Sequence, residues 1–156
     1  MKKSLKTFLL CLAIPLLTGG LSAFLTCGAM ADFRQLNQPP LSPPGILFPV
    51  VWSILYALMG IASYLILTAP KENSDIPTAL KLYGIQLAVN ALWPLFFFRL
   101  KWYLFSFFWL LLLWLAILVT IRLFGRICPA ASRLLLPYLI WVTFAGYLNL
   151  GIYWLN

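Results

Sequence analysis

The sequence predicts an all-α membrane protein, a bundle of five transmembrane helices that forms a single domain over residues 1–156. The composition is the first observation behind this prediction. Hydrophobic residues make up 63% of the chain and charged residues only 9%, whereas a soluble domain carries about 25% charged residues. A globule of this length has too much surface to hide so many apolar side chains from water. We therefore expect lipid to be the solvent.

The second observation is that the apolar residues fall into five runs. Each run is close to the ~20 residues that a helix needs to cross ~30 Å of hydrocarbon. The runs are bounded by charged residues, proline or glycine, and they cover about residues 5–30, 44–67, 79–98, 102–123 and 134–155. Strand-like alternation is missing, and a transmembrane barrel needs about eight strands or more. The linkers are short, which favours one bundle.

The first run also has features of a signal peptide. Lys2 and Lys3 precede it, and residues 29–31 read Ala-Met-Ala, which is the form of a cleavage site. However, the apolar stretch is longer than the roughly 7–15 residues of a signal-peptide core, and Pro15 lies in its middle. We expect the run to be retained as the first helix.

The basic residues predict the orientation in the membrane. One side holds eight Lys and Arg residues, namely Lys2, Lys3, Lys6, Lys71, Lys81, Arg122, Arg126 and Arg133. The other side holds three, Arg34, Arg99 and Lys101. If the first run were removed with Lys2, Lys3 and Lys6, the counts on the two sides would be five and three. The positive-inside rule then places the N-terminus in the cytoplasm, and we expect the bacterial cell membrane as the location. The net charge of +8 comes from helix ends and loops without a separate basic patch, so no nucleic-acid partner is expected.

Several kinds of chemistry are disfavoured by what the runs lack. The chain has no histidine, and its three cysteines have no C-x-x-C spacing, so no metal site is predicted. All three carboxylates, Asp32, Glu72 and Asp75, fall in loops. Ion-coupled carriers place ionisable groups inside the membrane, which disfavours that class. No catalytic residue and no required cofactor can be named, so the chain is more easily interpreted as a binding protein than as an enzyme.

Aromatic and amide side chains share faces on three of the expected helices. Helical spacing places on common faces Gln86, Asn90, Trp93 and Phe97 in the third helix, Trp52, Tyr56 and Met59 in the second, and Trp141, Phe144, Ala145 and Leu148 in the fifth. One interpretation is a shared aromatic interior that binds a ligand. The alternative is ordinary helix packing with hydrogen bonds between helices. Trp109 and Trp114 lie on the fourth helix, where the sequence shows no polar partner nearby.

Three ordered segments resemble a known family. LNQPPLSPPG at residues 36–45 leads into FPVVWSILYALMG at 48–60; QLAVNALW follows at 86–93 and LPYLIWVTFAGYLN at 136–149. They resemble the TspO/MBR family of tryptophan-rich sensory proteins and translocator proteins, also called the peripheral-type benzodiazepine receptor family. The likeness extends over essentially the whole chain and includes the five-helix layout.

The resemblance implies a receptor that senses or sequesters tetrapyrroles. Family members bind porphyrins such as protoporphyrin IX and haem, sterols and isoquinoline carboxamides, and they are commonly homodimers. The ligand pocket is capped by the first loop. By motif position, the binding residues would be Phe33 and Pro43 in the lid and Trp52, Tyr56, Asn90, Trp93, Trp141, Phe144, Ala145 and Leu148 in the pocket. Uncoupled transport of a hydrophobic molecule and enzymatic porphyrin breakdown are the alternatives.

The chain departs from the family in its first loop. The family's Trp-Tyr and Trp-x-Pro-Pro are replaced here by Asp32-Phe33 and by Leu41 followed by Ser-Pro-Pro. Both loop tryptophans are therefore missing, which argues against the light-dependent porphyrin degradation proposed for the family. The basic residue that ends the cholesterol motif of animal members is also absent, since none follows Arg133.

Small residues on the third helix suggest a dimer interface. Gly84, Ala88 and Ala91 are spaced by four and then three residues, and such spacing lets two helix backbones approach closely. The stripe is rotated away from Asn90 and Trp93, so one helix could serve both a dimer and a ligand. The alternative is that the stripe packs against a helix of the same chain.

Overall fold

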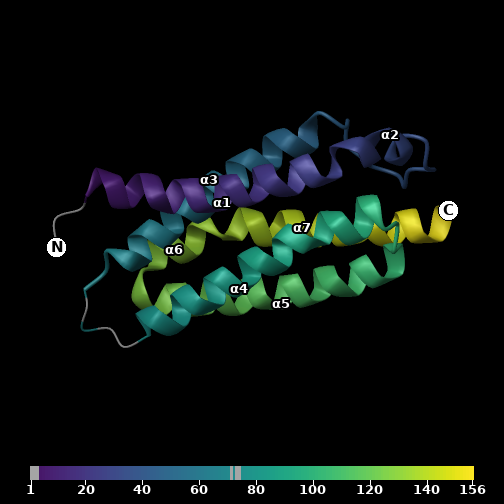
Figure 1. Cartoon of the computed structure of the whole chain (residues 1–156). Coiled ribbons are helices and arrows are strands. Elements are labelled where there is room, and N and C mark those ends of the chain that lie inside the picture. Colours follow the sequence, from purple (N-terminus) through teal and green to yellow (C-terminus); the bar gives the residue numbers. More distant parts are fainter. Residues whose placement is uncertain (1–3, 71, 73–74) are drawn as a thin grey trace.

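The computed structural model describes residues 4–70, 72 and 75–156, and within these residues it contains helices and no strands (Figure 1). Five helical stretches are long and apolar enough to cross a membrane, which confirms the all-α, five-span prediction. Lys2, Lys3 and Lys71, which enter the orientation prediction, lie outside the described residues. The elements are α1 (Leu5–Thr26), η1 (Cys27–Ala29), α2 (Met30–Phe33), α3 (Leu47–Leu67), α4 (Ile76–Pro94), η2 (Leu95–Arg99), α5 (Tyr103–Ile127), α6 (Pro129–Leu134) and α7 (Leu136–Leu155).

The long helices run side by side along one axis. Helix α1 packs against α3, α4 against α5, and α5 against α6 and α7. The short α2 and the C-terminus lie at one end of the bundle, while the chain enters α1 at the other end (Figure 1). We call the end with α2 and the C-terminus the lid end, because the loop between α2 and α3 covers it.

The helix boundaries differ from the predicted ones where proline decides. The second span begins at Leu47 rather than at residue 44, because the preceding proline-rich segment forms turns. The third begins earlier, at Ile76, with a proline in its first turn, where a missing N–H costs nothing. Beyond Pro94 its last five residues form the wider π-helical turn η2.

The last two spans show the same effect. The fourth span extends to Ile127 instead of residue 123 and ends because Pro129 follows the extended residue Cys128. The fifth span is interrupted between α6 and α7. Pro137 there has no N–H to donate to the carbonyl one turn earlier, so the helix restarts at Leu136.

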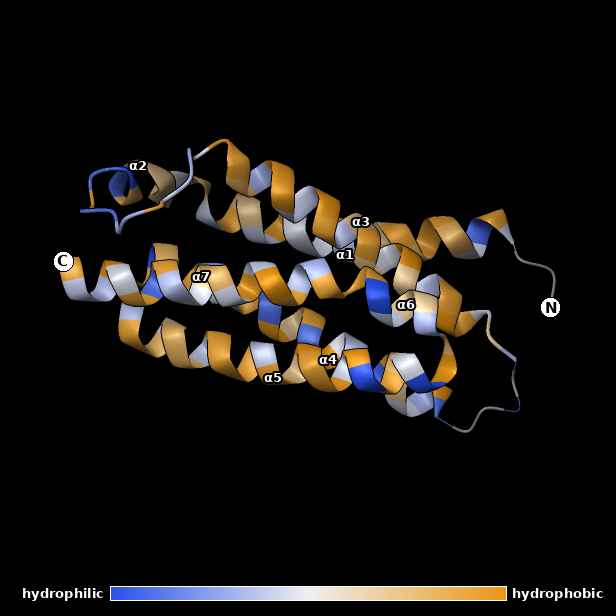
Figure 2. Ribbon diagram, turned by 180° about the vertical axis from the view of Figure 1, so that it is seen from behind, coloured by the Kyte–Doolittle hydropathy of each residue, from blue (hydrophilic) through white to orange (hydrophobic). Residues whose placement is uncertain are grey.

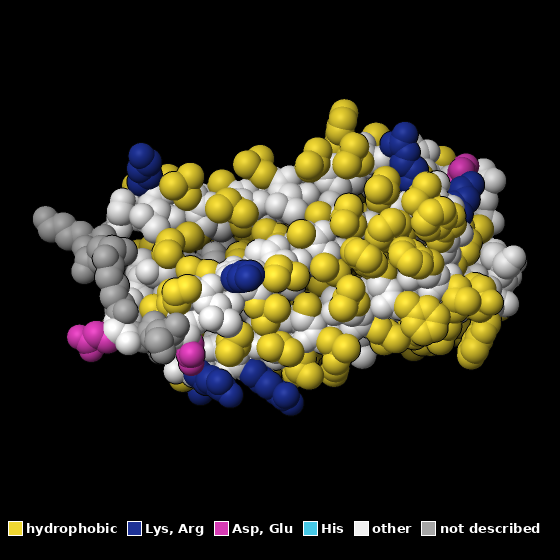
Figure 3. Space-filling model, turned by 60° about the horizontal axis from the view of Figure 1, so that its bottom comes forward, with side chains coloured by type: hydrophobic (Ala, Val, Ile, Leu, Met, Phe, Trp, Pro, Cys, Tyr) yellow, Lys and Arg dark blue, Asp and Glu magenta, His cyan; other side chains and the backbone are white. Residues whose placement is uncertain are grey.

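The outer surface is apolar along the length of the bundle. Leu17, Phe24 and Ile140 are 71%, 74% and 69% exposed, and exposed leucines occur on every long helix. Figure 2 shows hydrophobic residues along all the long helices, and Figure 3 shows hydrophobic side chains over one face with Lys, Arg, Asp and Glu mostly toward the ends. A surface of this kind is unsuited to water and suited to hydrocarbon.

Glycine brings α1 and α3 unusually close. A Cβ at Gly60 of α3 would lie 2.8 Å from the Cys11 carbonyl oxygen and from the Leu12 Cα of α1. A Cβ at Gly19 of α1 would collide with the ring of Tyr56. Close backbone approach is a main source of helix association in lipid. The Gly19 contact also fixes the position of the Tyr56 ring, which belongs to the site described next.

Candidate ligand-binding site

A buried chain of hydrogen bonds joins α3, α4 and α7. The Tyr56 hydroxyl donates to Asn90 Oδ1 (2.9 Å), Asn90 Nδ2 donates to the Tyr138 hydroxyl (2.5 Å), and that hydroxyl donates to Gln86 Oε1 (2.8 Å). Asn90, Gln86 and Tyr138 are each 1% exposed. Polar groups inside a membrane protein must be satisfied internally, so this chain holds the three helices in a fixed relation.

The tryptophan of the second span covers this polar chain. The Trp52 ring stacks on Tyr56 with centroids 5.6 Å apart and an interplanar angle of 30°. It meets Tyr138 edge-on at 6.2 Å. One indole face therefore lies against a tyrosine whose hydroxyl is already held by Asn90. Aromatic rings in such fixed positions provide a flat apolar surface next to defined hydrogen-bonding groups.

A second buried cluster surrounds Trp93 near the lid end. The Trp93 indole N–H donates to Asn149 Oδ1 (3.2 Å), which also accepts from Ser106 (2.9 Å). The Trp93 ring stacks on Phe97 at 5.1 Å, and Phe33 of α2 packs on the same Phe97 at 5.7 Å. Phe33 thus brings α2, at the lid end, into contact with the aromatic cluster around Trp93.

The cavity at this cluster is small. It has a volume of about 20 Å³, and its lining includes four of the predicted binding residues, Phe33, Trp93, Ala145 and Leu148. A single water molecule needs about 10–15 Å³ on this type of measure. The aromatic side chains therefore fill the interior themselves, and a flat ligand would have to displace some of them.

Trp141 and Phe144 form a third aromatic group, on the outer side of α7. Trp141 meets Phe144 at 5.6 Å and meets Phe48 of α3 edge-on at 5.8 Å. Both residues line an open groove of about 560 Å³ between α3 and α7. The Trp141 Nε1 is buried and has no hydrogen-bond partner among the residues that the structure describes.

The lid is fastened to the end of α7. The Asn37 backbone N–H donates to Asn156 Oδ1 (2.9 Å), and Asn156 Nδ2 donates back to the Asn37 carbonyl (3.0 Å). The Tyr147 hydroxyl donates to the Pro40 carbonyl (2.7 Å). Pro39 lies directly on Gly151, where a Cβ would come within 2.6 Å of the proline ring. These contacts hold the loop down along the last two turns of α7.

A strained turn lies at the tip of the lid. Ser42 donates its backbone N–H to the Pro39 carbonyl (3.3 Å), which closes a four-residue turn with Pro40 at the second position. Leu41 occupies the third position with φ 68°, as a type II turn requires. Glycine is the usual residue there because a side chain is strained at positive φ. Leu41 itself is 82% exposed, so its side chain contributes little packing in return.

An ion pair links α2 to the start of α5. Lys101 Nζ lies 2.9 Å from Asp32 Oδ2, and this hydrogen bond raises the pKa of the Lys101 amine above its usual value. Both side chains are more than half exposed, so solvent screens the attraction. The ion pair therefore contributes little to holding α2 against the start of α5.

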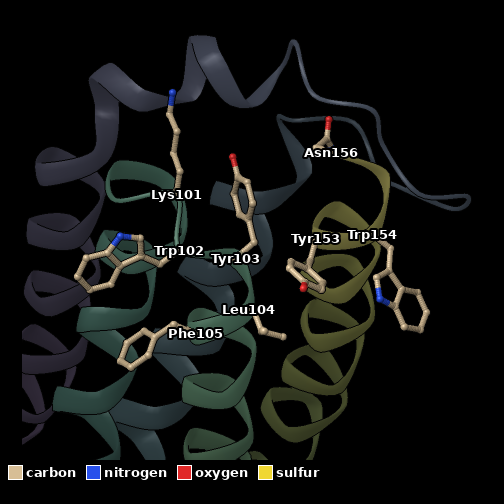
Figure 4. Close-up of a pocket in the computed structure, with 8 residues that line it drawn as sticks. All are labelled: Lys101, Trp102, Tyr103, Leu104, Phe105, Tyr153, Trp154 and Asn156. Carbon is tan, nitrogen blue, oxygen red and sulfur yellow. The ribbon is translucent and has the colours of Figure 1, made fainter.

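A shallow pocket of about 590 Å³ lies outside the aromatic interior, between the start of α5 and the end of α7. Figure 4 shows Trp102 and Phe105 on one side of it and Tyr153 and Trp154 on the other. Trp102 and Trp154 are 53% and 76% exposed. Indoles at helix ends are typical of the membrane–water interface. None of the predicted binding residues lines this pocket.

The predicted site residues therefore form three neighbouring groups rather than one wall. Tyr56, Asn90 and Trp52 share the polar chain; Phe33, Trp93, Ala145 and Leu148 share the lid-end cavity; Trp141 and Phe144 face the α3–α7 groove. Pro43 is half-buried in the lid loop and lines neither space.

Two residues at the centre of the site belong neither to the predicted helix faces nor to the predicted binding residues. Tyr138 joins Asn90 to Gln86, and Asn149 accepts the Trp93 N–H. Asn149 lies four residues after Ala145 on the same face of α7, so a polar amide at helical spacing was the available signal.

The small residues predicted for a dimer interface do not all face the same way. Gly84 and Ala88 are exposed on α4, and a Cβ at Gly84 would meet nothing within 4 Å. The Ala91 carbonyl instead accepts the Ser22 hydroxyl of α1 at 2.9 Å. Gly84 and Ala88 are therefore available to a second chain, whereas Ala91 lies beside α1 of its own chain.

Comparison with known proteins places this arrangement in a family. The sequence profile of the TspO/MBR family matches residues 11–155. The chain belongs to the TspO/MBR family. Its relatives include the "Tryptophan-rich protein TspO" of Chlorobaculum tepidum, which is 37% identical over 100% of this chain and 99% of its own length. The "Translocator protein" of Bos taurus is 36% identical over 87% of this chain and 82% of its own length. The "Tryptophan-rich sensory protein" of Cereibacter sphaeroides is 36% identical over 83% of this chain and 85% of its own length.

Membership in the TspO/MBR family agrees with the five apolar spans. The chain is a multi-pass membrane protein, and the names of its TspO/MBR relatives support a sensory or binding role in the membrane.

Proposed function

We propose that this protein binds a porphyrin, protoporphyrin IX or haem, within the aromatic groups between α3, α4 and α7, and that it senses or sequesters this ligand. The observation that carries the proposal is two stacked aromatic pairs near the buried Asn90: Trp52 stacks on Tyr56, which is hydrogen-bonded to Asn90, and Trp93, one turn further along α4, stacks on Phe97. Stacking of a flat ring on one aromatic side chain is worth about 1–3 kcal/mol in nucleic-acid complexes, and a porphyrin is a larger flat ring.

The hydrogen-bonded chain supports a fixed binding surface. Gln86 Nε2 is buried and has no partner among the described residues, although Gln86 Oε1 accepts from Tyr138. An amide donor that is held in place and unsatisfied favours a ligand with an oxygen acceptor. Protoporphyrin IX and haem combine an apolar ring with carboxylates, which matches this combination of groups.

The composition of the spans favours a binding protein over an ion-coupled carrier. The long helices α1, α3, α4, α5 and α7 contain no Asp or Glu, and the acidic residues Asp32, Glu72 and Asp75 fall at their ends or between them. A coupled carrier needs ionisable groups near the middle of the membrane. Uncoupled passage of the ligand and its breakdown are separated from binding by the test below.

The membrane context belongs to the same proposal. The eight-to-three distribution of basic residues supports an N-terminus in the cytoplasm and a lid end on the outer face of a bacterial cell membrane. Gly84 and Ala88, exposed on α4, support a homodimer through that helix.

A titration of the purified protein with protoporphyrin IX tests the proposed function. The protein is placed in lipid nanodiscs, and both intrinsic tryptophan fluorescence and porphyrin absorbance are followed in the dark and in light. Saturable quenching without progressive loss of porphyrin absorbance, in the dark and in light, is the expected result. Absence of saturable quenching overturns the proposal. Quenching accompanied by steady loss of porphyrin absorbance in light would instead assign the protein to porphyrin breakdown.

A further inference from the structure

The groove between α3 and α7 opens to the lipid side of the bundle. It is lined by Val51, Ile54, Leu55 and Leu58 of α3 and by Pro137, Ile140, Trp141 and Phe144 of α7. Ile54 and Ile140 are 56% and 69% exposed, so they mark its outer edge. Helix α3 packs its backbone closely on α1 and α6, whereas it meets α7 mainly through side chains. The groove therefore lies at a contact between α3 and α7 that is made mainly by side chains.

A pair of rings lies between this groove and the interior cavity. Trp141 lines the groove, Phe48 lines the 20 Å³ cavity beside Trp93, and the two rings touch edge-on at 5.8 Å. Rotation of these two side chains would join the groove to the cavity without moving a helix. Side-chain rotation is faster and less costly than displacement of a helix or loop.

The lid end offers a more obstructed route. There the reciprocal Asn37–Asn156 hydrogen bonds, the Tyr147–Pro40 hydrogen bond and the Pro39–Gly151 contact all hold the loop against α7. A ligand that entered under the lid would have to break these contacts together. A ligand dissolved in the bilayer can enter the open α3–α7 groove without breaking any of these contacts.

The indole N–H of Trp141 is a buried donor on a side chain that lines the groove. Trp93, Trp109 and Trp114 donate their indole N–H groups to Asn149, the Val89 carbonyl and Thr143. The Trp141 Nε1 is buried and, among the described residues, has no acceptor. An unsatisfied donor is costly inside a membrane. A carboxylate or carbonyl on an entering ligand would satisfy it.

We infer that the α3–α7 groove is the entrance through which a flat, hydrophobic ligand with an oxygen acceptor passes from the bilayer into the aromatic interior. The Trp141–Phe48 pair is the gate, and the Trp141 N–H, which is buried while the gate is closed, donates a hydrogen bond to the ligand when the rings turn. This inference rests on the proposed porphyrin-binding function and adds the route of entry to it.

Filling the groove from its outer edge tests the entrance. In the double variant Ile54→Phe, Ile140→Phe, both changes are at exposed, lipid-facing positions, so the core is left intact. The matched control is Leu111→Phe, Leu115→Phe on α5, where both residues are also exposed and Leu111 lines the separate groove between α5 and α7. Each protein is mixed with vesicles carrying protoporphyrin IX in a stopped-flow instrument, and tryptophan quenching gives the association and dissociation rates.

The groove variant is expected to associate and dissociate about tenfold more slowly, with a dissociation constant within about threefold of wild type, because an entrance affects rates and not the bound state. The control variant is expected to match wild type. A groove variant with wild-type rates overturns the entrance while leaving the proposed function standing. A wild-type protein without saturable quenching overturns the proposed function and the entrance together.

A second variant distinguishes the groove from the lid. Asn37→Ala, Asn156→Ala removes the Asn156 side chain, which holds the Asn37 backbone, and the Asn37 side chain, which donates to the Leu155 carbonyl. If the ligand enters through the groove, the association rate of this variant stays close to the wild-type rate. A rise of about tenfold would show that opening the lid limits entry, and it would overturn the inference.

Discussion

Tyr138→Phe is the most direct test of the buried hydrogen-bonded chain. The change removes one hydroxyl and keeps the aromatic ring, so the packing against Trp52 is preserved. That hydroxyl accepts from Asn90 and donates to Gln86, and both amides are 1% exposed. The variant therefore leaves a donor and an acceptor without a partner in a site closed to solvent.

The expected loss of stability follows from these two bonds. Hydrogen bonds between membrane helices contribute about 0.6 kcal/mol on average and about 1.7 kcal/mol at most. Leaving a buried group unsatisfied adds a desolvation penalty of about 1–3 kcal/mol. We expect Tyr138→Phe to lower the free energy of unfolding by about 2–3 kcal/mol. Tyr56→Phe removes only the terminal bond to Asn90 and is expected to cost about 1 kcal/mol.

The measurement is reversible unfolding in mixed micelles with increasing sodium dodecyl sulfate, followed by tryptophan fluorescence. Tyr153→Phe is the control, because this tyrosine is 41% exposed and lies outside the chain. The control is expected to stay within about 0.5 kcal/mol of wild type. If Tyr138→Phe unfolds at the same detergent fraction as Tyr153→Phe, the chain does not hold α3, α4 and α7 together.

Four further predictions concern the ligand, the dimer, the lid and the topology. Trp141→Ala should weaken protoporphyrin IX binding about tenfold, while Trp154→Ala at the exposed helix end should not; equal affinities would place the site elsewhere. Gly84→Leu combined with Ala88→Leu should convert a dimer to a monomer by light scattering while porphyrin binding persists, and an unchanged dimer would rule out this face of α4. Leu41→Gly should raise the thermal midpoint by relieving about 1 kcal/mol of strain at φ 68°, and a lower midpoint would contradict the strained turn. A C-terminal alkaline phosphatase fusion should be active, and a C-terminal fluorescent protein should be dark. The opposite pattern would reverse the orientation. N-terminal sequencing that begins after residue 31 would show that the first run is cleaved.

The sequence alone determined the number of spans and which residues share a face of one helix. Hydrocarbon thickness fixes the length of an apolar helix, so five runs were enough to predict five helices. Helical periodicity placed Gln86, Asn90 and Trp93 on one face of α4, and all three are buried there. The run lengths did not give the exact ends of the helices, because proline shifts several of them and interrupts the fifth span before Pro137.

Only the tertiary structure decided which residues on those faces are partners. Periodicity gives the face of a helix but neither its rotation in the bundle nor its neighbour. For this reason the sequence did not reveal that Tyr138 would join Asn90 to Gln86, or that Ala91 would lie against α1. Trp109 and Trp114 had no polar partner nearby in the sequence, yet they donate to α4 and α7.

The division of the site into three groups has the same origin. Trp52, Trp93 and Trp141 are equivalent as sequence signals, because each lies on an aromatic face of an apolar helix. Close packing of α1 on Gly60 and the small backbone contact between α3 and α7 set how each face is turned. Trp52 is directed toward Tyr56 and Tyr138, Trp93 toward the amide of Asn149, and Trp141 toward the lipid-side groove. Helix rotation depends on packing between residues far apart in the chain, which no local pattern in the sequence encodes.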